Sequence, residues 1–251
     1  MDGLAQKSGG VRTASVPIIE NYGSWRRVRL AMDSKIVTRE LWKAVGPLLK
    51  EAGWASFSSR TARRFSQSRI DVITFQSFNS YLASRIGSTT YSFAIRLGCF
   101  FTAIPHSGIK IKDSLLMPEE YHCHLRYTIP KKFYQSECDR ADVFYVDPKG
   151  DYLPTVVGAA LQGIGTEGFA WFRRFSDMRE VLRTLMEDNE SNDGTFGFGA
   201  KSSPARNLYT GSIALSLGKT QIAQKHLTQA AISPSYADFR EQIEAQLASL
   251  K

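Results

Sequence analysis

The run from Tyr91 to Ile104 (YSFAIRLGCFFTAI) restricts most strongly what this chain can fold into. Aromatic and β-branched residues dominate it, which is typical of a strand that packs against neighbours on both sides. We therefore expect a central strand of a sheet. No apolar run in the chain approaches the roughly 18–20 residues of a membrane-spanning helix, so no membrane protein is expected.

Three further segments have the composition of strands, at 55–65, 69–78 and 120–128, and clusters of Ser, Asn and Gly separate them. Within the second segment, the residues Val72, Thr74 and Gln76 alternate with Ile73, Phe75 and Ser77. A short strand at 142–147 (DVFYVD) is expected before a turn at Asp147–Gly150.

Helical spacing of apolar residues predicts a first helix that begins at Asp33 or Ser34 as its N-cap. Gly46-Pro47 should kink or break this helix, and Gly53 should end it. Further helices are expected at about 152–163 and 177–188, and, after a polar Gly-rich stretch, at 204–217, 219–231 and 235–249.

This order of elements predicts an α+β fold, in which an antiparallel β-sheet has helices packed on one face. Residues 1–33 are interpreted as a flexible leader and 34–190 as the α+β domain. Residues 191–203 are interpreted as a linker, and 204–251 as a C-terminal helical hairpin or three-helix module.

The chain has a net charge of +8, from 32 Lys and Arg against 24 Asp and Glu. Residues 1–32 hold five basic and two acidic side chains, so part of this excess lies in the leader and the charge is weak evidence for a nucleic-acid partner. The three cysteines form no CxxC pair, which predicts neither disulfides nor a cysteine zinc site. No secretory signal is present at the start of the chain, and a cytoplasmic location is expected.

Two glycine motifs look like nucleotide-binding sequences but lack the context that such binding needs. Gly163–Gly168 matches GxGxxG, yet a predicted helix precedes it, so we expect a helix C-cap and turn there. Gly218-Lys219-Thr220 lacks the first glycine of a phosphate loop, because position 213 is isoleucine. We expect no cofactor.

The same C-terminal residues resemble one tetratricopeptide helix pair. The resemblance rests on Gly211, Gly218, Ala223, Leu227 and Ala230, with Pro234 one residue early. A generic helical hairpin explains them equally well. A lone repeat cannot bury its own apolar face, so it should dock on the rest of the chain or on a partner.

Two other clusters suggest binding. His122 and His124 flank Cys123 on an expected strand and would share one face there, but further metal ligands are not evident, so we predict no metal site. The arginines Arg60, Arg63, Arg64 and Arg69 lie among phenylalanines and could contact single-stranded nucleic acid, or could form a solvated strand face. The expected partner-binding residues are Arg63, Arg64, Gln76, His122, His124 and Arg126.

The middle of the chain resembles a bacterial family known as domain of unknown function 4304. The matching pieces are LWKAVGPLLKEAGW, RTARRF, VITFQSF, FAIRLGCF, PEEYHCHLRYTI and GFAWFRRFSDMREVLRTL, in the order of the family. The resemblance covers about residues 35–190. It implies an α+β fold and small accessory proteins, some of an immunity-like kind, and it supplies no activity and no catalytic residues.

No GxSxG elbow, metalloprotease motif or other catalytic signature is found, so we expect that the protein is not an enzyme. The favoured function is a non-enzymatic accessory protein that binds an unknown protein partner through the open face of its sheet or through the C-terminal hairpin. The alternative is nucleic-acid binding by the basic aromatic segment 57–69.

Overall fold

A computed structural model describes residues 32–187 and 194–250. Every element below belongs to the unit Ala31–Lys251. Most of the predicted leader lies outside the described residues.

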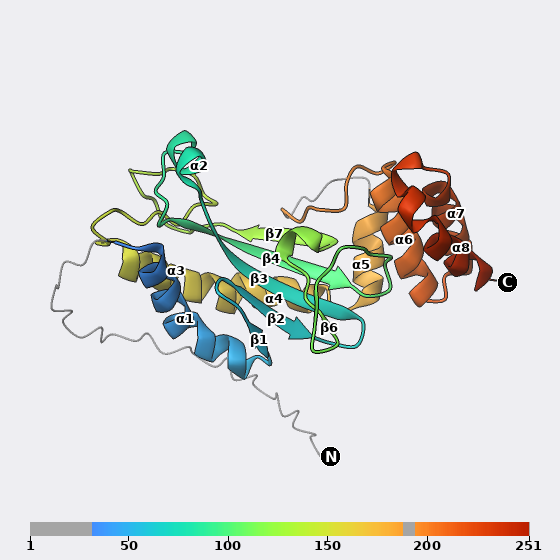
Figure 1. The fold of residues 1–251 in the computed structure, drawn as a ribbon, viewed down its shortest axis with the longest axis horizontal. Helices are drawn as coiled ribbons and strands as arrows, with labels where there is room; N and C mark the ends of the chain where they lie inside the picture. Colours follow the sequence, from blue (N-terminus) through green and yellow to red (C-terminus); the bar gives the residue numbers. More distant parts are fainter. Residues whose placement is uncertain (1–31, 188–193, 251) are drawn as a thin grey trace, which may run out of the picture. The chain divides into compact units, whose positions relative to one another are not determined.

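The main sheet is antiparallel and five-stranded, in the order β1-β2-β3-β4-β7 (Figure 1). A two-stranded hairpin, β5-β6, lies outside it. The strands are β1 (Ser56–Phe57), β2 (Thr61–Phe65), β3 (Arg69–Ser77), β4 (Phe93–Phe101), β5 (Ile111–Lys112), β6 (Leu115–Leu116) and β7 (Leu125–Ile129).

The helices follow in two groups, one within the α+β part and one after residue 200. The first group is α1 (Ser34–Glu51), α2 (Ser80–Arg85), η1 (Glu120–His122), α3 (Leu153–Gly163), η2 (Ile164–Gly168), α4 (Phe169–Arg174) and α5 (Met178–Met186). The second is α6 (Pro204–Ser216), α7 (Thr220–Ala231), η3 (Pro234–Phe239) and α8 (Arg240–Ala248). The predicted α+β fold is therefore confirmed.

The predicted central strand is β4, which pairs with β3 on one side and β7 on the other. Its alternate residues Ile95, Leu97 and Cys99 join the large core, which the buried faces of α1, α3 and α4 complete. The opposite set faces away from these helices and belongs to two smaller clusters, around Ala94 and around Phe100. Burial on both faces explains why β4 is apolar apart from Arg96.

Helix α1 begins as predicted, because the Asp33 side chain accepts from the Lys35 amide at 3.0 Å. Of the predicted kink or break at Gly46-Pro47, the break does not occur, because α1 runs through Pro47 to Glu51. Val45 and Leu49 are both fully buried, so the core holds the helix on either side of Pro47. The helix ends at Glu51, and Gly53 follows with a φ of +83°.

The GxGxxG segment corrects a second prediction, that of a C-cap and turn. The chain stays helical from α3 through the π-helical η2 into α4. A β-carbon on Gly163 would lie 2.9 Å from the Ile129 side chain, and one on Gly168 would lie 3.2 Å from it. The glycines therefore let this helical segment approach β7 closely, and no strand precedes them as a dinucleotide site would need.

The segment predicted as a strand at 142–147 forms a single bridge between Phe144 and Phe93. Of the segment interpreted as a linker, residues 191–193 lie outside the described residues, and Thr195 and Phe198 are buried. Phe196 bridges Arg126, and Phe198 has only 1% of its surface exposed.

The C-terminal helices form a hairpin, α6 and α7, with α8 packed against them. A β-carbon on Gly211 would lie 2.7 Å from the Leu227 side chain, so glycine lets α6 and α7 approach closely. Several contacts join these helices to the α+β part, including polar contacts of α6 and α8. The Gln246 amide donates to the Ala103 carbonyl at 2.9 Å, Tyr209 packs on His124, and Arg206 donates to Leu185.

Candidate functional site

The face of the sheet that points away from α1, α3 and α4 carries a polar row across four strands. The register places Thr61, Thr74, Arg96 and Thr128 side by side, one from each of β2, β3, β4 and β7. The two small apolar clusters cover the sheet on either side of this row. We call this surface the open face.

The η1 turn lies over the next row of the open face, above Gly98. A β-carbon on Gly98 would lie 2.5 Å from the Cys123 sulfur, so only glycine leaves room for the turn. Arg63, with 2% of its surface exposed, donates to the Pro118 carbonyl at 2.7 Å and to Glu119 at 2.5 Å. Thr61 donates to the same carboxylate at 3.2 Å. These contacts hold η1 and its carboxylates on the sheet.

Three carboxylates around the open face each have an arginine of their own. Glu119 pairs with Arg63 at 2.5 Å, Glu120 with Arg126 at 2.6 Å, and Asp142 with Arg140 at 2.7 Å. The hydrogen bonds from Arg140 lower the pKa of Asp142. Each of the three carboxylates therefore has an arginine as its assigned partner in a short, charge-assisted pair.

Arg96 differs from the three paired arginines because its hydrogen bonds go to neutral groups. Its Nε donates to the Gln76 side-chain oxygen at 3.1 Å, and one of its terminal nitrogens donates to the Thr128 hydroxyl. The nearest carboxylate, Asp142, is 4.0 Å away and is held by Arg140. Its guanidinium is therefore oriented but not neutralised by a close carboxylate.

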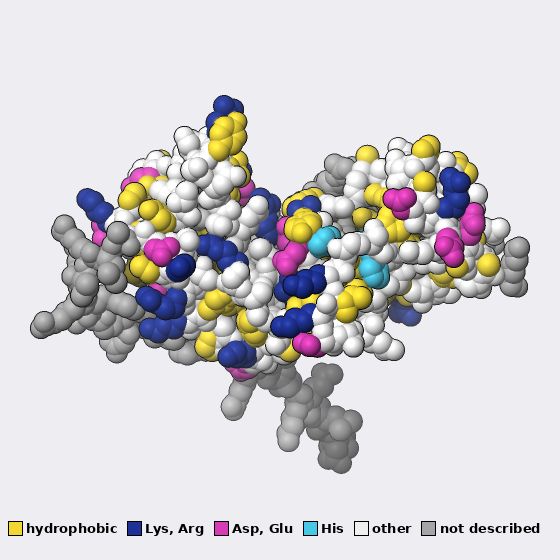
Figure 2. Space-filling model, in the orientation of Figure 1, with side chains coloured by type: hydrophobic (Ala, Val, Ile, Leu, Met, Phe, Trp, Pro, Cys, Tyr) yellow, Lys and Arg dark blue, Asp and Glu magenta, His cyan; other side chains and the backbone are white. Residues whose placement is uncertain are grey.

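These groups surround a hollow of about 310 Å³. Its lining comes from β3, β4, β7 and the η1 region, and consists of Thr74, Gln76, Arg96, Glu119, Glu120, Tyr121 and Arg126. We call it the open-face pocket. Tyr121 has 67% of its surface exposed, so its ring is available to a partner at the pocket. Figure 2 shows acidic and basic side chains next to one another over the middle of the drawn face.

The structure brings together three of the six predicted binding residues. Gln76 and Arg126 line the open-face pocket, and Arg63 lies beside them, buried beneath η1. Arg64 lies on the opposite, helix-covered face. Its guanidinium pairs with Asp71 at 2.7 Å and lies over the Trp54 ring.

The two predicted histidines do not share a face, which corrects the interpretation of 120–128 as one strand. His122 ends the η1 turn, where its Nδ1 accepts from the Glu119 amide at 3.0 Å. His124 is buried, and its Nδ1 accepts from the Phe101 amide at 3.0 Å. Each ring nitrogen Nδ1 therefore has a structural partner. In the part of the chain that the structure describes, no three His, Cys, Asp or Glu residues are grouped to hold a metal ion.

Sequence reasoning missed Arg96, Glu119, Glu120 and Tyr121, all of which line the pocket. Arg96 could have been found, because it is the charged residue within the otherwise apolar β4 run and such a residue needs partners. The other three could not, since the η1 turn that positions them has no helical or strand periodicity.

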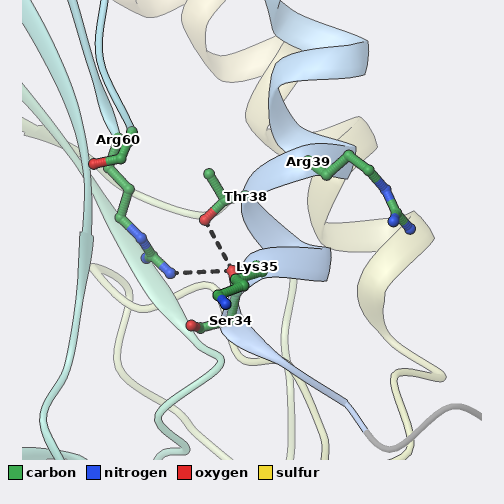
Figure 3. Close-up of a pocket in the computed structure, with 6 residues that line it drawn as sticks. Ser34, Lys35, Thr38, Arg39 and Arg60 are labelled. Atoms are coloured by element: carbon green, nitrogen blue, oxygen red, sulfur yellow. Dashed lines mark hydrogen bonds between the residues drawn. The ribbon is translucent and has the colours of Figure 1, made fainter.

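The basic segment 57–69 does not present its arginines on one surface. Arg63 and Arg69 are buried and paired with Glu119 and Asp71. Arg60 lines a second hollow, of about 330 Å³, where it donates to the Ser34 carbonyl at 3.3 Å (Figure 3). Figure 3 shows Arg39, the other arginine of this hollow, pointing away from Arg60, so the two guanidinium groups do not converge on a common ligand.

Residues 45–161 match the family described as Domain of unknown function (DUF4304). The matched part runs from within α1 to within α3, so it includes the sheet, η1 and the open-face pocket. The resemblance predicted from the sequence is confirmed over these residues. No curated protein and no solved structure matches the chain. None of the helices in the described residues is long and apolar enough to cross a membrane.

Proposed function

We propose that this protein is a non-enzymatic accessory protein that binds a protein partner through the open-face pocket. The observation that carries the proposal is the combination of an exposed tyrosine, Tyr121, with arginines that the fold already orients, Arg96 and Arg126. Tyrosine and arginine are enriched among the residues that contribute most to protein interfaces.

Preorganisation supports a binding role. Arg126 donates to Glu120 through two nitrogens, at 2.6 and 3.1 Å, and its guanidinium lies 4.9 Å from the centre of the Phe196 ring. Hydrogen bonds to the neutral groups of Gln76 and Thr128 orient Arg96. Side chains fixed in advance lose less entropy when a partner binds, so more of the contact energy appears as affinity.

The pairing of the carboxylates supports a non-enzymatic role. A general acid must carry a proton near neutral pH, which usually requires burial away from cations. Glu119 and Glu120 are instead each held by an arginine. The three cysteines are free and buried, which fits a reducing compartment, and we place the protein in a bacterial cytoplasm.

The C-terminal hairpin remains a candidate tetratricopeptide-like unit in this proposal. Its close packing at Gly211 supports that interpretation, and its contacts through Arg206, Tyr209 and Gln246 fit the expectation that a lone unit docks on the rest of the chain. We therefore assign partner binding to the open-face pocket first.

The geometry supports nucleic-acid binding less well. A phosphate backbone needs several exposed cations on one surface. Among the arginines of segment 57–69, two are buried in ion pairs and Arg64 is shared between Asp71 and the Trp54 ring. A mobility-shift assay with Arg63→Ala plus Arg64→Ala checks this alternative. Salt-sensitive binding that the double substitution abolishes, with an unchanged circular dichroism spectrum and denaturation midpoint, would favour nucleic acid over a protein partner.

Site-specific photo-crosslinking tests the proposed function. A benzoylphenylalanine replaces Tyr121 at the pocket or, as the matched control, Arg173, which is exposed on the helix-covered side in α4. We expect a protein adduct in extracts of the native host from position 121 and not from 173, reproduced with the purified partner. Identical adducts at both positions, or none at 121, would contradict the proposal.

A further inference from the structure

The arginines around the open face outnumber by one the carboxylates that pair closely with them. Arg63, Arg126 and Arg140 each have a carboxylate at 2.5 to 2.7 Å. Arg96 stands among them with two neutral acceptors and one carboxylate at 4.0 Å that already belongs to Arg140. Within this linked group of seven charged side chains, the unmatched positive charge is therefore on Arg96.

Arg96 is also placed where a ligand can reach it. About a quarter of its side chain is exposed, at 24%, and it lines the open-face pocket. The Gln76 and Thr128 contacts use Nε and one terminal nitrogen, so the second terminal nitrogen has only the 4.0 Å approach to Asp142. An arginine donates five N–H groups in a rigid fork that suits a carboxylate.

The neighbouring charges limit which anion fits. Glu119 and Glu120 line the same pocket and would repel a ligand that carries several negative charges close together, such as a phosphate backbone. A single carboxylate beside neutral or basic groups carries one negative charge and meets less of this repulsion. Tyr121, at the same pocket, offers an aromatic surface to the flanking residues of a peptide.

We infer that Arg96 recognises an aspartate or glutamate side chain of the partner protein. This inference rests on the proposed function and names the chemistry of its partner: an acidic segment with a single carboxylate at the contact point. The Arg96 guanidinium forms the salt bridge with this carboxylate, and Gln76 and Thr128 hold the guanidinium in position.

A nuclear magnetic resonance titration of the full chain tests the inference, observing the side-chain Nε–H groups of the arginines. The probes are the blocked tripeptide Ala-Asp-Ala, its matched control Ala-Asn-Ala, and inorganic phosphate. The Nε–H resonance that is missing from the spectrum of Arg96→Lys is assigned to Arg96. Exposed Arg39, which contacts Glu40, serves as the internal reference.

We expect the aspartate peptide to shift the Arg96 resonance in a saturable way, with a dissociation constant on the order of 10–100 mM for one charge-assisted contact. The asparagine peptide should give no saturable shift, and Arg96→Gln should abolish the accompanying shift of the Gln76 amide. Equal effects of the two peptides, or a shift no larger than that of Arg39, would overturn the inference. Saturation by phosphate alone would overturn it in favour of a phosphate-bearing ligand.

The outcome separates this inference from the proposed function. With the partner identified by crosslinking at position 121, Arg96→Gln should weaken its binding by roughly ten- to hundredfold. If position 121 crosslinks to the partner and the Arg96→Gln variant binds that partner with unchanged affinity, the carboxylate contact is rejected. Partner binding by the pocket would still hold. Absence of any adduct at 121 would reject the proposed function itself.

Discussion

The Arg206 guanidinium donates to the Leu185 carbonyl at 2.7 Å, across 21 residues of chain. Leu185 lies in the last turn of α5, where carbonyl groups lack partners within the helix. Arg206 also donates to the Thr184 and Glu187 carbonyls, stacks over the Phe198 ring, and has only 1% of its surface exposed. A buried cation therefore caps α5 and joins the C-terminal helices to the α+β part.

Arg206→Met should lower the free energy of unfolding by about 3 kcal/mol, because it removes the cap and leaves buried carbonyls without donors. Urea denaturation followed by circular dichroism measures the change. Arg179→Met is the matched control, since Arg179 is an exposed residue of α5 and should change stability by about 0.5 kcal/mol or less. Similar losses in both variants would contradict the role of Arg206.

Gly98→Ala should displace the η1 turn and lower the free energy of unfolding by about 1–3 kcal/mol. The added carbon would lie 2.5 Å from the Cys123 sulfur and 2.6 Å from its β-carbon, and neither can move without shifting η1. Because Glu119 and Glu120 flank the pocket from η1, the same variant should weaken partner binding.

Gly158→Ala is the control for this substitution. Gly158 lies within α3, and no atom of the surrounding structure lies within 4 Å of the place that its β-carbon would take. Alanine should therefore stabilise the protein by about 0.5–1 kcal/mol. Equal denaturation midpoints for the two variants would argue against the close approach at Gly98.

The sequence allowed the sheet to be predicted but not the pocket that lies on it. Alternation and β-branched residues identify strands such as β4 because burial acts on each residue locally. The pair of Arg63 with Glu119 joins residues 56 positions apart, and no local pattern records it. Gln76 and Arg126 were predicted as binding residues. The sequence marks Arg96 as an unusual charge in an apolar strand, but only the fold places Thr128 and Gln76 beside it.

The two histidines show the same limit. A strand through 120–128 would have placed them together, but the η1 turn changes the periodicity between them. Gly98 permits this turn, because the Cys123 side chain occupies the space that a β-carbon at position 98 would take. The small residue that permits the turn lies on another strand, so the periodicity of residues 120–128 cannot predict it.

Burial of His124 should make stability depend on pH. Desolvation lowers its pKa in the folded protein from the ordinary 6.5 to about 3. Between these values the unfolded chain binds a proton that the folded protein does not, so stability is highest above pH 6.5 and falls as the pH drops. The loss at pH 5 relative to neutral pH should be about 2 kcal/mol.

His124→Gln should reduce this dependence, because glutamine can accept from the Phe101 amide and does not titrate. Denaturation midpoints at several values between pH 5 and 7.5 measure the slope. His122→Gln is the comparison, because His122 is less buried and should change the slope less. A slope unaltered by His124→Gln would show that His124 is not the group responsible.

The thiols should be unreactive in the folded protein. Cys99, Cys123 and Cys138 are all free and have between 0% and 4% of their surfaces exposed. Burial raises the pKa of both Cys99 and Cys123, which disfavours the thiolate that reacts with disulfide reagents. With Ellman's reagent at pH 8, we expect little reaction in buffer and reaction of all three cysteines in guanidinium chloride.

Gly98→Ala is the informative variant, since a displaced η1 turn should expose Cys123 and accelerate the reaction of one thiol before the others. Rapid labelling of the unaltered, folded protein in buffer without denaturant would contradict the burial of these side chains.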